Sequence, residues 1–174
     1  RSVHFAGNPA ALATENYANW GGIVIEDAAH ALGAATPSGP VGNCSNSTMA
    51  CFSFHPVKTV TTGEGGAVTT NNAEIAYALK LFRSHGIERK EADQPWKYDI
   101  SSLGYNYRMT SFQAALGSSQ LRRLTKLVKE RNRLARLYRE VLSGFPVELP
   151  PESAPGYVHA NHIFPIRVRN RDAV

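Results

Sequence analysis

The chain has 174 residues, of which 43% are hydrophobic and 19% charged, so it can bury a core and is not a generally disordered polypeptide. No apolar run approaches the roughly 20 residues that span a bilayer, and no signal-peptide pattern opens the sequence. Cys44 and Cys51 form neither a disulfide framework nor a zinc pattern, which favours a reduced, cytoplasmic protein without a metal site. The length corresponds to one domain and a fragment of another, and we expect both ends, Arg1 and Val174, to be cut.

The net charge is 19 − 14 = +5, which suggests an anionic partner until its distribution is considered. Residues 1–120 sum to 8 − 9 = −1, residues 121–140 to 8 − 2 = +6, and residues 141–174 to 3 − 3 = 0. A basic helix over the middle segment could bind nucleic acid by neutralising phosphates. Because no recognised nucleic-acid motif accompanies the charge, we favour a solvated helix face and expect neither a nucleic acid nor a membrane as partner.

The first third of the chain predicts a βαβ unit. Residues 3–7 form a short strand and a turn, and residues 8–20 a helix that begins with an Asn-Pro cap. The wholly apolar residues 23–25 predict a strand buried on both faces of a parallel sheet. A right-handed crossover is expected between the two strands. Residues 33–47, rich in Gly, Pro, Ser and Asn, predict a loop.

The middle of the chain predicts two strands and a helix. The strands span residues 48–54 and 66–70, and the helix runs to about Ser84 after an Asn-Asn cap. Residues 86–104 mix charges, aromatic side chains and a proline, which indicates an ordered but irregular loop.

The last third predicts one long helix, from the capping box at Thr110 and Gln113 to about Ser143. Leucines recur there at three- and four-residue intervals and form an apolar stripe. Gly117 costs about 1 kcal/mol relative to alanine, so we expect a neighbour to approach its backbone closely. The alternating residues 163–168 predict a strand.

Three short stretches carry residues that could perform chemistry. Asp27 follows an apolar strand, where open α/β sheets hold ligands, although an acid that caps the next segment explains it equally well. Lys58 follows a buried aromatic stretch; it either points to solvent or is a desolvated amine with a lowered pKa, suited to Schiff-base chemistry. Residues 61–66, Thr-Thr-Gly-Glu-Gly-Gly, predict a tight turn, and they lack the Gly-Lys-Ser/Thr ending of a phosphate-binding P-loop.

Together these stretches resemble the sugar aminotransferases of the DegT/StrS type, which are pyridoxal-phosphate enzymes of fold type I. The resemblance is carried by residues 24–33 (VIEDAAHALG), 51–66 (CFSFHPVKTVTTGEGG) and 103–110 (LGYNYRMT). It implies an α/β fold, with a mostly parallel sheet and flanking helices, that is truncated at both ends. By the same resemblance, residues 1–144 are part of a large cofactor-binding domain and residues 145–174 begin a small C-terminal domain that is incomplete.

The resemblance assigns roles to five residues. Lys58 resembles the lysine that forms the Schiff base with pyridoxal 5'-phosphate and later moves the proton. Asp27 resembles the carboxylate that keeps the pyridine nitrogen protonated, and His30 a donor near the phenolic oxygen. Ser53 resembles the hydroxyl that binds the cofactor phosphate. Asn106 resembles an asparagine that reaches the phosphate of the neighbouring subunit, which implies a homodimer with a shared active site.

The substrate is inferred from weaker similarities to one branch of the family. Residues 95–98 and 104–108 look like the pseudaminic-acid branch of the family, the UDP-4-amino-4,6-dideoxy-N-acetyl-altrosamine transaminases. The substrate would then be a nucleotide-linked 4-keto-6-deoxy sugar and the amino-acid donor glutamate. Four residues would line the cleft: His55, His85, Tyr105 and Arg108. An arginine before a helix is also commonly structural.

Two alternatives remain open. Dehydratases of the same family carry histidine in place of the Schiff-base lysine; Lys58 argues against that reading, although His55 is close by. The second alternative is a non-catalytic fragment with a basic interaction helix. Fold type I proteins are much longer than this chain, and their N-terminal part supplies a Gly-Thr turn for the phosphate. The sequence therefore leaves open whether this piece binds the cofactor alone.

Overall fold

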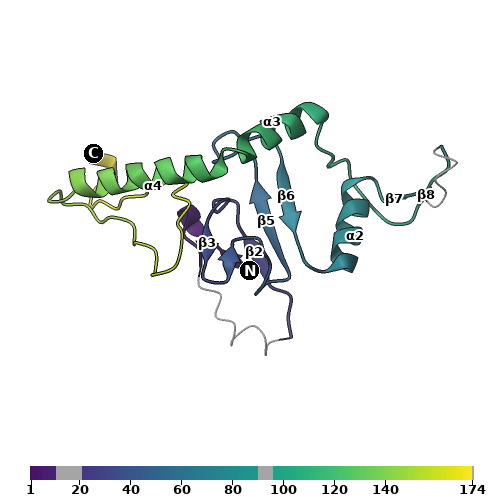
Figure 1. Cartoon of the computed structure of the whole chain (residues 1–174), viewed down its shortest axis with the longest axis horizontal. Helices are drawn as coiled ribbons and strands as arrows, with labels where there is room; N and C mark the ends of the chain where they lie inside the picture. The colour runs from purple at the N-terminus through teal and green to yellow at the C-terminus, as the bar shows by residue number, and fades with distance from the viewer. Residues whose placement is uncertain (11–20, 90–95, 174) are drawn as a thin grey trace.

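The structure is a computed structural model that describes residues 1–10, 21–89 and 96–173. The predicted helix over residues 8–20 lies almost wholly outside the described residues. The handedness of the crossover that it would make between the first two strands therefore stays a prediction. Within the described parts, a central sheet stands between a helical layer formed by α3 and α4 and a set of loops (Figure 1). The described residues include no helix long and apolar enough to cross a bilayer.

The central sheet has four strands in the order β1-β2-β5-β6. They are β1 (Ser2–Val3), β2 (Ile25–Asp27), β5 (Met49–Ser53) and β6 (Gly66–Thr69). β1, β2 and β5 run parallel, whereas β6 pairs antiparallel with β5. The predicted strands over residues 48–54 and 66–70 are confirmed to within one residue at either end, and the expected mostly parallel sheet is present.

The prediction for residues 23–25 is wrong in position and in burial. The strand begins at Ile25, and Ile23 is 65% exposed. Glu26 is the buried member of β2, at 4% exposure. A charged side chain can take this core position because His4 and Ser47 hydrogen-bond to its carboxylate. An apolar run alone could not reveal those partners.

Two predicted loops contain short hairpins instead. Residues 33–47 include the antiparallel strands β3 (Ala35–Thr36) and β4 (Gly39–Pro40). Residues 86–104 include β7 (Ile87–Glu88) and β8 (Asp99–Ile100). Two-residue ladders are too short to produce an alternating pattern in the sequence.

The predicted strand over residues 163–168 is not formed. That segment contributes only an isolated antiparallel bridge between Glu148 and Arg167. Alternation of apolar and polar residues indicates which side chains face inward, but a strand also needs a partner along its whole length.

The helix α2 (Ala73–Arg83) begins as predicted, with the side chain of Asn72 accepting a hydrogen bond from the Ile75 amide. The capping box at Thr110 is confirmed and starts α3 (Ser111–Leu121). Our single long helix is wrong, because the chain breaks at Arg123 and resumes as α4 (Leu124–Val141).

The break separates two helices that pack against different parts of the molecule. In α3, the Gln120 amide group bonds the Thr61 amide and carbonyl at 3.2 and 2.9 Å, which anchors α3 to the β5–β6 connection. Gly117 is buried beside Thr62, and an added Cβ would lie 2.8 Å from the Thr62 Cγ2. The close approach expected at this glycine is confirmed. In contrast, α4 lies along the C-terminal segment (Figure 1).

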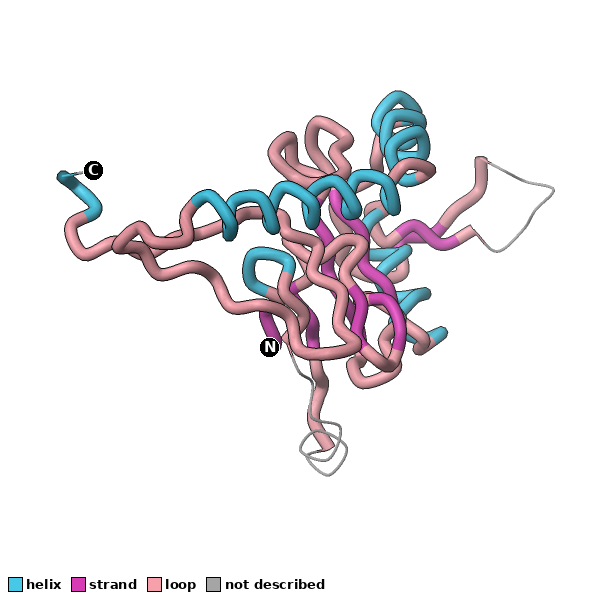
Figure 2. Tube along the Cα trace, turned by 60° about the vertical axis from the view of Figure 1, so that its left-hand side comes forward, coloured by secondary structure: helices cyan, strands magenta, loops and turns pink. Residues whose placement is uncertain are grey.

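The C-terminal segment returns along α4 and then pairs with the N-terminal part of the chain. Val158 exchanges two backbone hydrogen bonds with Ala35, and the His162 amide donates to the Ala6 carbonyl at 2.9 Å. The segment leaves the sheet on one side, while β7 and β8 project on the other, in both views of the molecule (Figures 1 and 2). The described chain ends with a short 3₁₀ turn, Arg171–Ala173.

The basic helix is only partly a solvated face. Arg131 donates to the carbonyls of Asn161 and His162, and Arg139 donates to the Pro150 carbonyl at 2.6 Å. The other basic side chains of residues 121–140 are exposed. Part of the positive charge therefore fastens the returning segment to α4.

Candidate functional site

The site is built at the edge where the parallel strands β2 and β5 end. Asp27 is the last residue of β2 and pairs in register with Cys51 of β5. Ser53 ends β5 two residues further along. Because both strands point the same way, the carboxylate and the hydroxyl lie at the same edge of the sheet, where α/β proteins bind ligands.

Lys58 reaches this edge from the connection between β5 and β6. The turn that carries it is closed by a 2.9 Å hydrogen bond from the Lys58 amide to the His55 carbonyl. Its side chain is half-buried, and its positive charge acts on the imidazoles of His30 and His162. The amine therefore stands beside two histidines that come from distant parts of the chain.

His30 lies near both the Asp27 carboxylate and the Lys58 amine, whose charges act on its ring. Burial lowers its pKa below the ordinary value of 6.5; the Lys58 charge adds to this, while the Asp27 carboxylate opposes it. Its ring contacts those of Phe5 and His162, with centroid distances of 6.2 and 4.6 Å. At neutral pH the ring is therefore uncharged, and it contacts two other aromatic rings.

Asp27 is kept ionised in this environment. Burial raises the pKa of the carboxyl, but the hydrogen bonds from the Arg1 guanidinium and from the Ala29 amide, together with the Arg1 charge, lower it by more, so the pKa lies below 3.8. The carboxylate can therefore pair with a cation. Arg1 fills that role in this structure.

The turn after β5 also carries Ser53 and His55. The Ser53 hydroxyl accepts a 3.3 Å hydrogen bond from the His55 amide. The His55 ring is exposed; its Nδ1 accepts from the Val57 amide, and its Nε2 lies 3.9 Å from the Glu64 carboxylate. Gly63 has φ +79°, so the turn needs the glycine predicted there.

The remaining predicted residues form a second cluster at the end of α2. The His85 amide donates to the Tyr105 carbonyl at 2.9 Å, and Asn106 forms an antiparallel bridge with Ser84. Arg108 donates to the Asn106 side-chain oxygen at 3.1 Å. This cluster is largely exposed and lies on the far side of β6 from β2 (Figure 1). The structure thus brings Asp27, His30 and Lys58 together within one chain but leaves the Asn106 cluster apart from them.

Sequence reasoning missed one residue at the main site, His162. It is 8% exposed, and its Nδ1 has no hydrogen-bond partner among the described residues. Burial, with the nearby charges of His30, Lys58 and Arg131, lowers its pKa to about 4. No motif in residues 158–164 signalled this position, because it depends on the return of the chain along α4.

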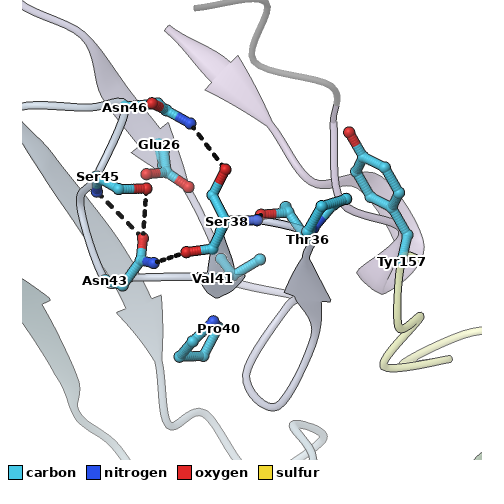
Figure 3. A pocket seen from close by; sticks show the side chains of 10 residues that line it. Glu26, Thr36, Ser38, Pro40, Val41, Asn43, Ser45, Asn46 and Tyr157 are labelled. Atoms are coloured by element: carbon cyan, nitrogen blue, oxygen red, sulfur yellow. Dashed lines mark hydrogen bonds between the residues drawn. The ribbon is translucent and has the colours of Figure 1, made fainter.

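A separate pocket lies on the other side of β2. Its lining is polar and includes Glu26, Ser38, Asn43 and Tyr157 (Figure 3). The Asn43 side chain donates to the Ser38 carbonyl and accepts from the amide and hydroxyl of Ser45, so these groups already bond one another. None of the predicted site residues lines this pocket.

The residues at the strand edge fit pyridoxal phosphate by their chemistry. A half-buried amine can hold an aldehyde covalently, an ionised carboxylate can pair with a protonated ring nitrogen, and a hydroxyl can bind a phosphate. Lys58, Asp27 and Ser53 supply these three groups from one edge. The described residues include no group of three or more His, Cys, Asp or Glu side chains suited to a metal ion.

The sheet and its flanking helices form an α/β fold of the aminotransferase type. Residues 2–174 match the DegT/DnrJ/EryC1/StrS aminotransferase family, and the chain belongs to it. The fold resemblance inferred from the sequence is thereby confirmed. The chain is 45% identical over 115 residues to a UDP-4-amino-4,6-dideoxy-N-acetyl-beta-L-altrosamine transaminase of Campylobacter jejuni, which covers 66% of the chain and 29% of that protein.

Solved structures show the same similarity. Helicobacter pylori PseC, described as an aminotransferase involved in the biosynthesis of pseudoaminic acid, superposes with a TM-score of 0.87 at 31% identity. The match covers 97% of this chain and 45% of PseC. The PLP form of a putative sugar aminotransferase from Streptococcus pneumoniae has a TM-score of 0.81 at 26% identity, over 96% of this chain and 47% of that one. The family's cofactor is therefore pyridoxal phosphate, and the chain spans less than half of each of these relatives.

Proposed function

We propose that the intact protein carrying this chain is a pyridoxal-phosphate-dependent aminotransferase. It moves an amino group, from glutamate as donor, to C4 of a nucleotide-linked 4-keto-6-deoxy sugar. The observation that supports this most is the convergence of Lys58, His30 and Asp27 at one sheet edge. The histidine of the dehydratases is absent from position 58, which favours amino transfer over dehydration.

Lys58 has the central role. When bound, the cofactor would supply an aldehyde that condenses with amines and a ring that accepts electrons from the reacting carbon. The Lys58 amine would hold that aldehyde. When free, the same amine would take the proton from the Cα of the donor amino acid, and it would return a proton during the second half-reaction, in which C4 of the sugar receives nitrogen.

Asp27 and His30 tune the site around the lysine. The ionised Asp27 carboxylate would hold a protonated ring nitrogen of the cofactor by charge pairing, the role that Arg1 fills in this structure. His30 is uncharged at neutral pH, so one of its ring nitrogens can donate a hydrogen bond to a phenolic oxygen without adding a further positive charge beside Lys58.

The phosphate and the substrate would be bound from two subunits. Ser53 holds the phosphate from its own subunit, and the exposed Asn106 reaches the phosphate of a partner in a cytoplasmic homodimer. Four further side chains line the sugar-nucleotide cleft: His55, His85, Tyr105 and Arg108. Residues 1–144 belong to the large domain in this arrangement, and residues 145–174 begin the small one.

The test uses the intact protein mixed with pyridoxal phosphate. We expect a visible absorption band that borohydride abolishes, with the cofactor mass left on the peptide that contains Lys58. Lys58→Ala should lose both the band and the adduct. Lys80→Ala is the matched control, because Lys80 is an exposed lysine of α2 and should leave both unchanged.

Two outcomes would contradict the proposal. One is a full covalent adduct in Lys58→Ala. The other is conversion of the 4-keto sugar nucleotide to a 3-deoxy product without incorporation of nitrogen from labelled glutamate. For the shared site, equal mixing of Lys58→Ala and Asn106→Ala subunits makes about half of the dimers mixed, and each mixed dimer has one intact site of two. The mixture should therefore regain about one quarter of the wild-type activity.

A further inference from the structure

His162 stands beside the proposed cofactor site, and the Nδ1 of its ring has no hydrogen-bond partner among the described residues. Its side chain is more than nine-tenths buried, and its Nδ1 is the one buried side-chain nitrogen or oxygen among the described residues that lacks a partner. A buried polar atom without a partner costs free energy. The contacts of the ring therefore indicate what role offsets this free-energy cost.

The ring of His162 packs directly on His30. The centroids lie 4.6 Å apart and the planes are inclined by 40°, a distance within the range of favourable aromatic pairs. The Phe5 ring also lies near His30, with the centroids 6.2 Å apart and the planes inclined by 55°. His30 therefore contacts two rings from opposite ends of the chain, and we call this pair of ring contacts the clamp on His30.

The segment that carries His162 is itself fixed in place. Its amide donates to the Ala6 carbonyl, and its carbonyl accepts from the Arg131 guanidinium at 3.0 Å. The titratable and charged groups that face His162 are His30, Lys58 and Arg131. All three disfavour a positive charge on its ring, so the clamp stays uncharged at neutral pH.

We propose that His162 is a positioning residue, whose buried ring sets the orientation of His30 and thereby the hydrogen bond that His30 offers to the cofactor. Only the part that concerns the hydrogen bond to the cofactor rests on the proposed function. The part that concerns the clamp on His30 holds without any cofactor, because it depends on this chain's own residues. The contribution of His162 comes from its ring, not from its charge.

The first experiment follows the His30 titration in the intact protein without cofactor. Histidine Cε1 resonances are recorded against pH, and His30→Asn assigns the His30 signal. The wild-type midpoint lies below 6.5 because the ring is buried, beside Lys58. His162→Ala uncovers the ring, so its midpoint should rise by about half a pH unit. His162→Phe keeps an apolar ring there and should leave the midpoint low.

Two further variants show whether a change in the His30 midpoint comes from the loss of the ring or from a folding defect. His162→Gln fills most of the space without a ring and should resemble His162→Ala. His159→Ala removes a half-buried histidine of the same segment, on which the charge of Arg139 acts and not that of His30, and should leave the midpoint unchanged. Far-ultraviolet circular dichroism selects the folded variants.

The second experiment measures the dissociation constant of pyridoxal phosphate. His162→Ala and His162→Gln should weaken binding about tenfold, the upper end of what one ring contact contributes, and His162→Phe by less than about twofold. An unchanged His30 midpoint in both ringless variants would overturn the inference, as would an equal shift in His162→Phe. A wild-type protein that binds no pyridoxal phosphate refutes the proposed function instead, and the titration still decides the clamp.

Discussion

The Nε2 of His4 lies 2.7 Å from the Oε2 of Glu26, and the two side chains are 1% and 6% exposed. The His4 Nδ1 accepts a 2.9 Å hydrogen bond from the Ala10 amide, so the proton is on Nε2 and is donated to the carboxylate. The Ser47 hydroxyl donates to the other carboxylate oxygen. This network joins β1 to β2 one residue before Asp27, and it therefore supports the strand end on which the site is built.

Loss of the Glu26 charge should destabilise the protein. Burial raises the pKa of this carboxyl, but the hydrogen bonds from His4 and Ser47 lower it by more, which keeps the carboxylate ionised. In Glu26→Gln we expect the free energy of unfolding in urea to fall by about 1.5–3 kcal/mol, since hydrogen bonds to a charged acceptor are lost. Glu64→Gln is the control: its side chain is 75% exposed, and the change should stay within about 0.5 kcal/mol. Equal effects of the two substitutions would contradict the structural role.

The sequence predicted the parts of the fold that depend on neighbouring residues. The caps at Asn72 and Thr110 and the strands after residues 48 and 66 were readable because turn and cap chemistry is local. The roles that the family resemblance implied for Asp27 and Lys58 required the two residues to lie close together, which is how the structure places them around His30. Nothing local could indicate Glu26 as a core residue, or the break at Arg123, because each depends on partners far along the chain.

His162 is the clearest case of that limit. It lies 132 positions after His30 (162 − 30 = 132), and only the return of the chain along α4 brings the two rings together. The alternation that predicted a strand just after His162 matches neither pairing nor burial, because Ile163 and Ile166 are exposed. A contact between two residues so far apart leaves no periodic pattern of apolar residues in the sequence, so sequence analysis cannot detect it.

Replacing Asp27 by asparagine should slow amino transfer much more than it lowers stability. The amide oxygen can still accept from the Ala29 amide, but the group no longer carries the charge that pairs with a protonated ring nitrogen. We expect the rate of the glutamate half-reaction, followed by stopped-flow absorbance, to drop about a hundredfold or more. The free energy of unfolding should change by less than about 1 kcal/mol. A rate within threefold of wild type would show that Asp27 does not face the cofactor ring.

Stability should fall as the pH is lowered from 7.5 to 5. His159 and His162 have pKa values of about 4 in the folded chain because of burial, against an ordinary value of 6.5. Below pH 6.5 the unfolded chain therefore binds protons that the folded chain does not, which favours unfolding. By pH 5 each histidine should lower the free energy of unfolding by about 2 kcal/mol. Chemical unfolding at both pH values measures this difference.

Between pH 7.5 and pH 5 the histidines lower the free energy of unfolding, whereas the carboxylates do so only at lower pH. Asp27 and Glu26 have ordinary pKa values of 3.8 and 4.5, lowered further in the folded chain, so their losses begin below pH 5. His162→Phe removes one of the two histidines with pKa values of about 4, whereas His159 and His30, whose pKa also lies below 6.5, keep their share. The pH dependence should therefore fall by less than half. A pH dependence in His162→Phe as steep as in wild type would mean that His162 is not buried in its neutral form.

An alanine at Gly117 should destabilise the protein even though alanine favours helices. Helix propensity alone would stabilise α3 by about 1 kcal/mol. The new Cβ, however, would lie 2.8 Å from the Thr62 Cγ2, and both residues are buried on the face where α3 meets the β5–β6 connection. Forcing a methyl group into such a contact costs about 1–3 kcal/mol. We therefore expect a net loss of about 1 kcal/mol in urea unfolding.

The matched control for Gly117 is its neighbour on the exposed side of the same helix. Ser118→Ala meets no close contact and should stabilise the protein by about 0.5 kcal/mol through propensity alone. The two substitutions therefore have opposite expected signs within one turn of α3. Combining Gly117→Ala with Thr62→Ser, which removes the clashing methyl group, should recover most of the loss, because the cost arises from that one contact. If Gly117→Ala stabilises the protein as Ser118→Ala does, α3 does not approach the connection as closely as the structure places it.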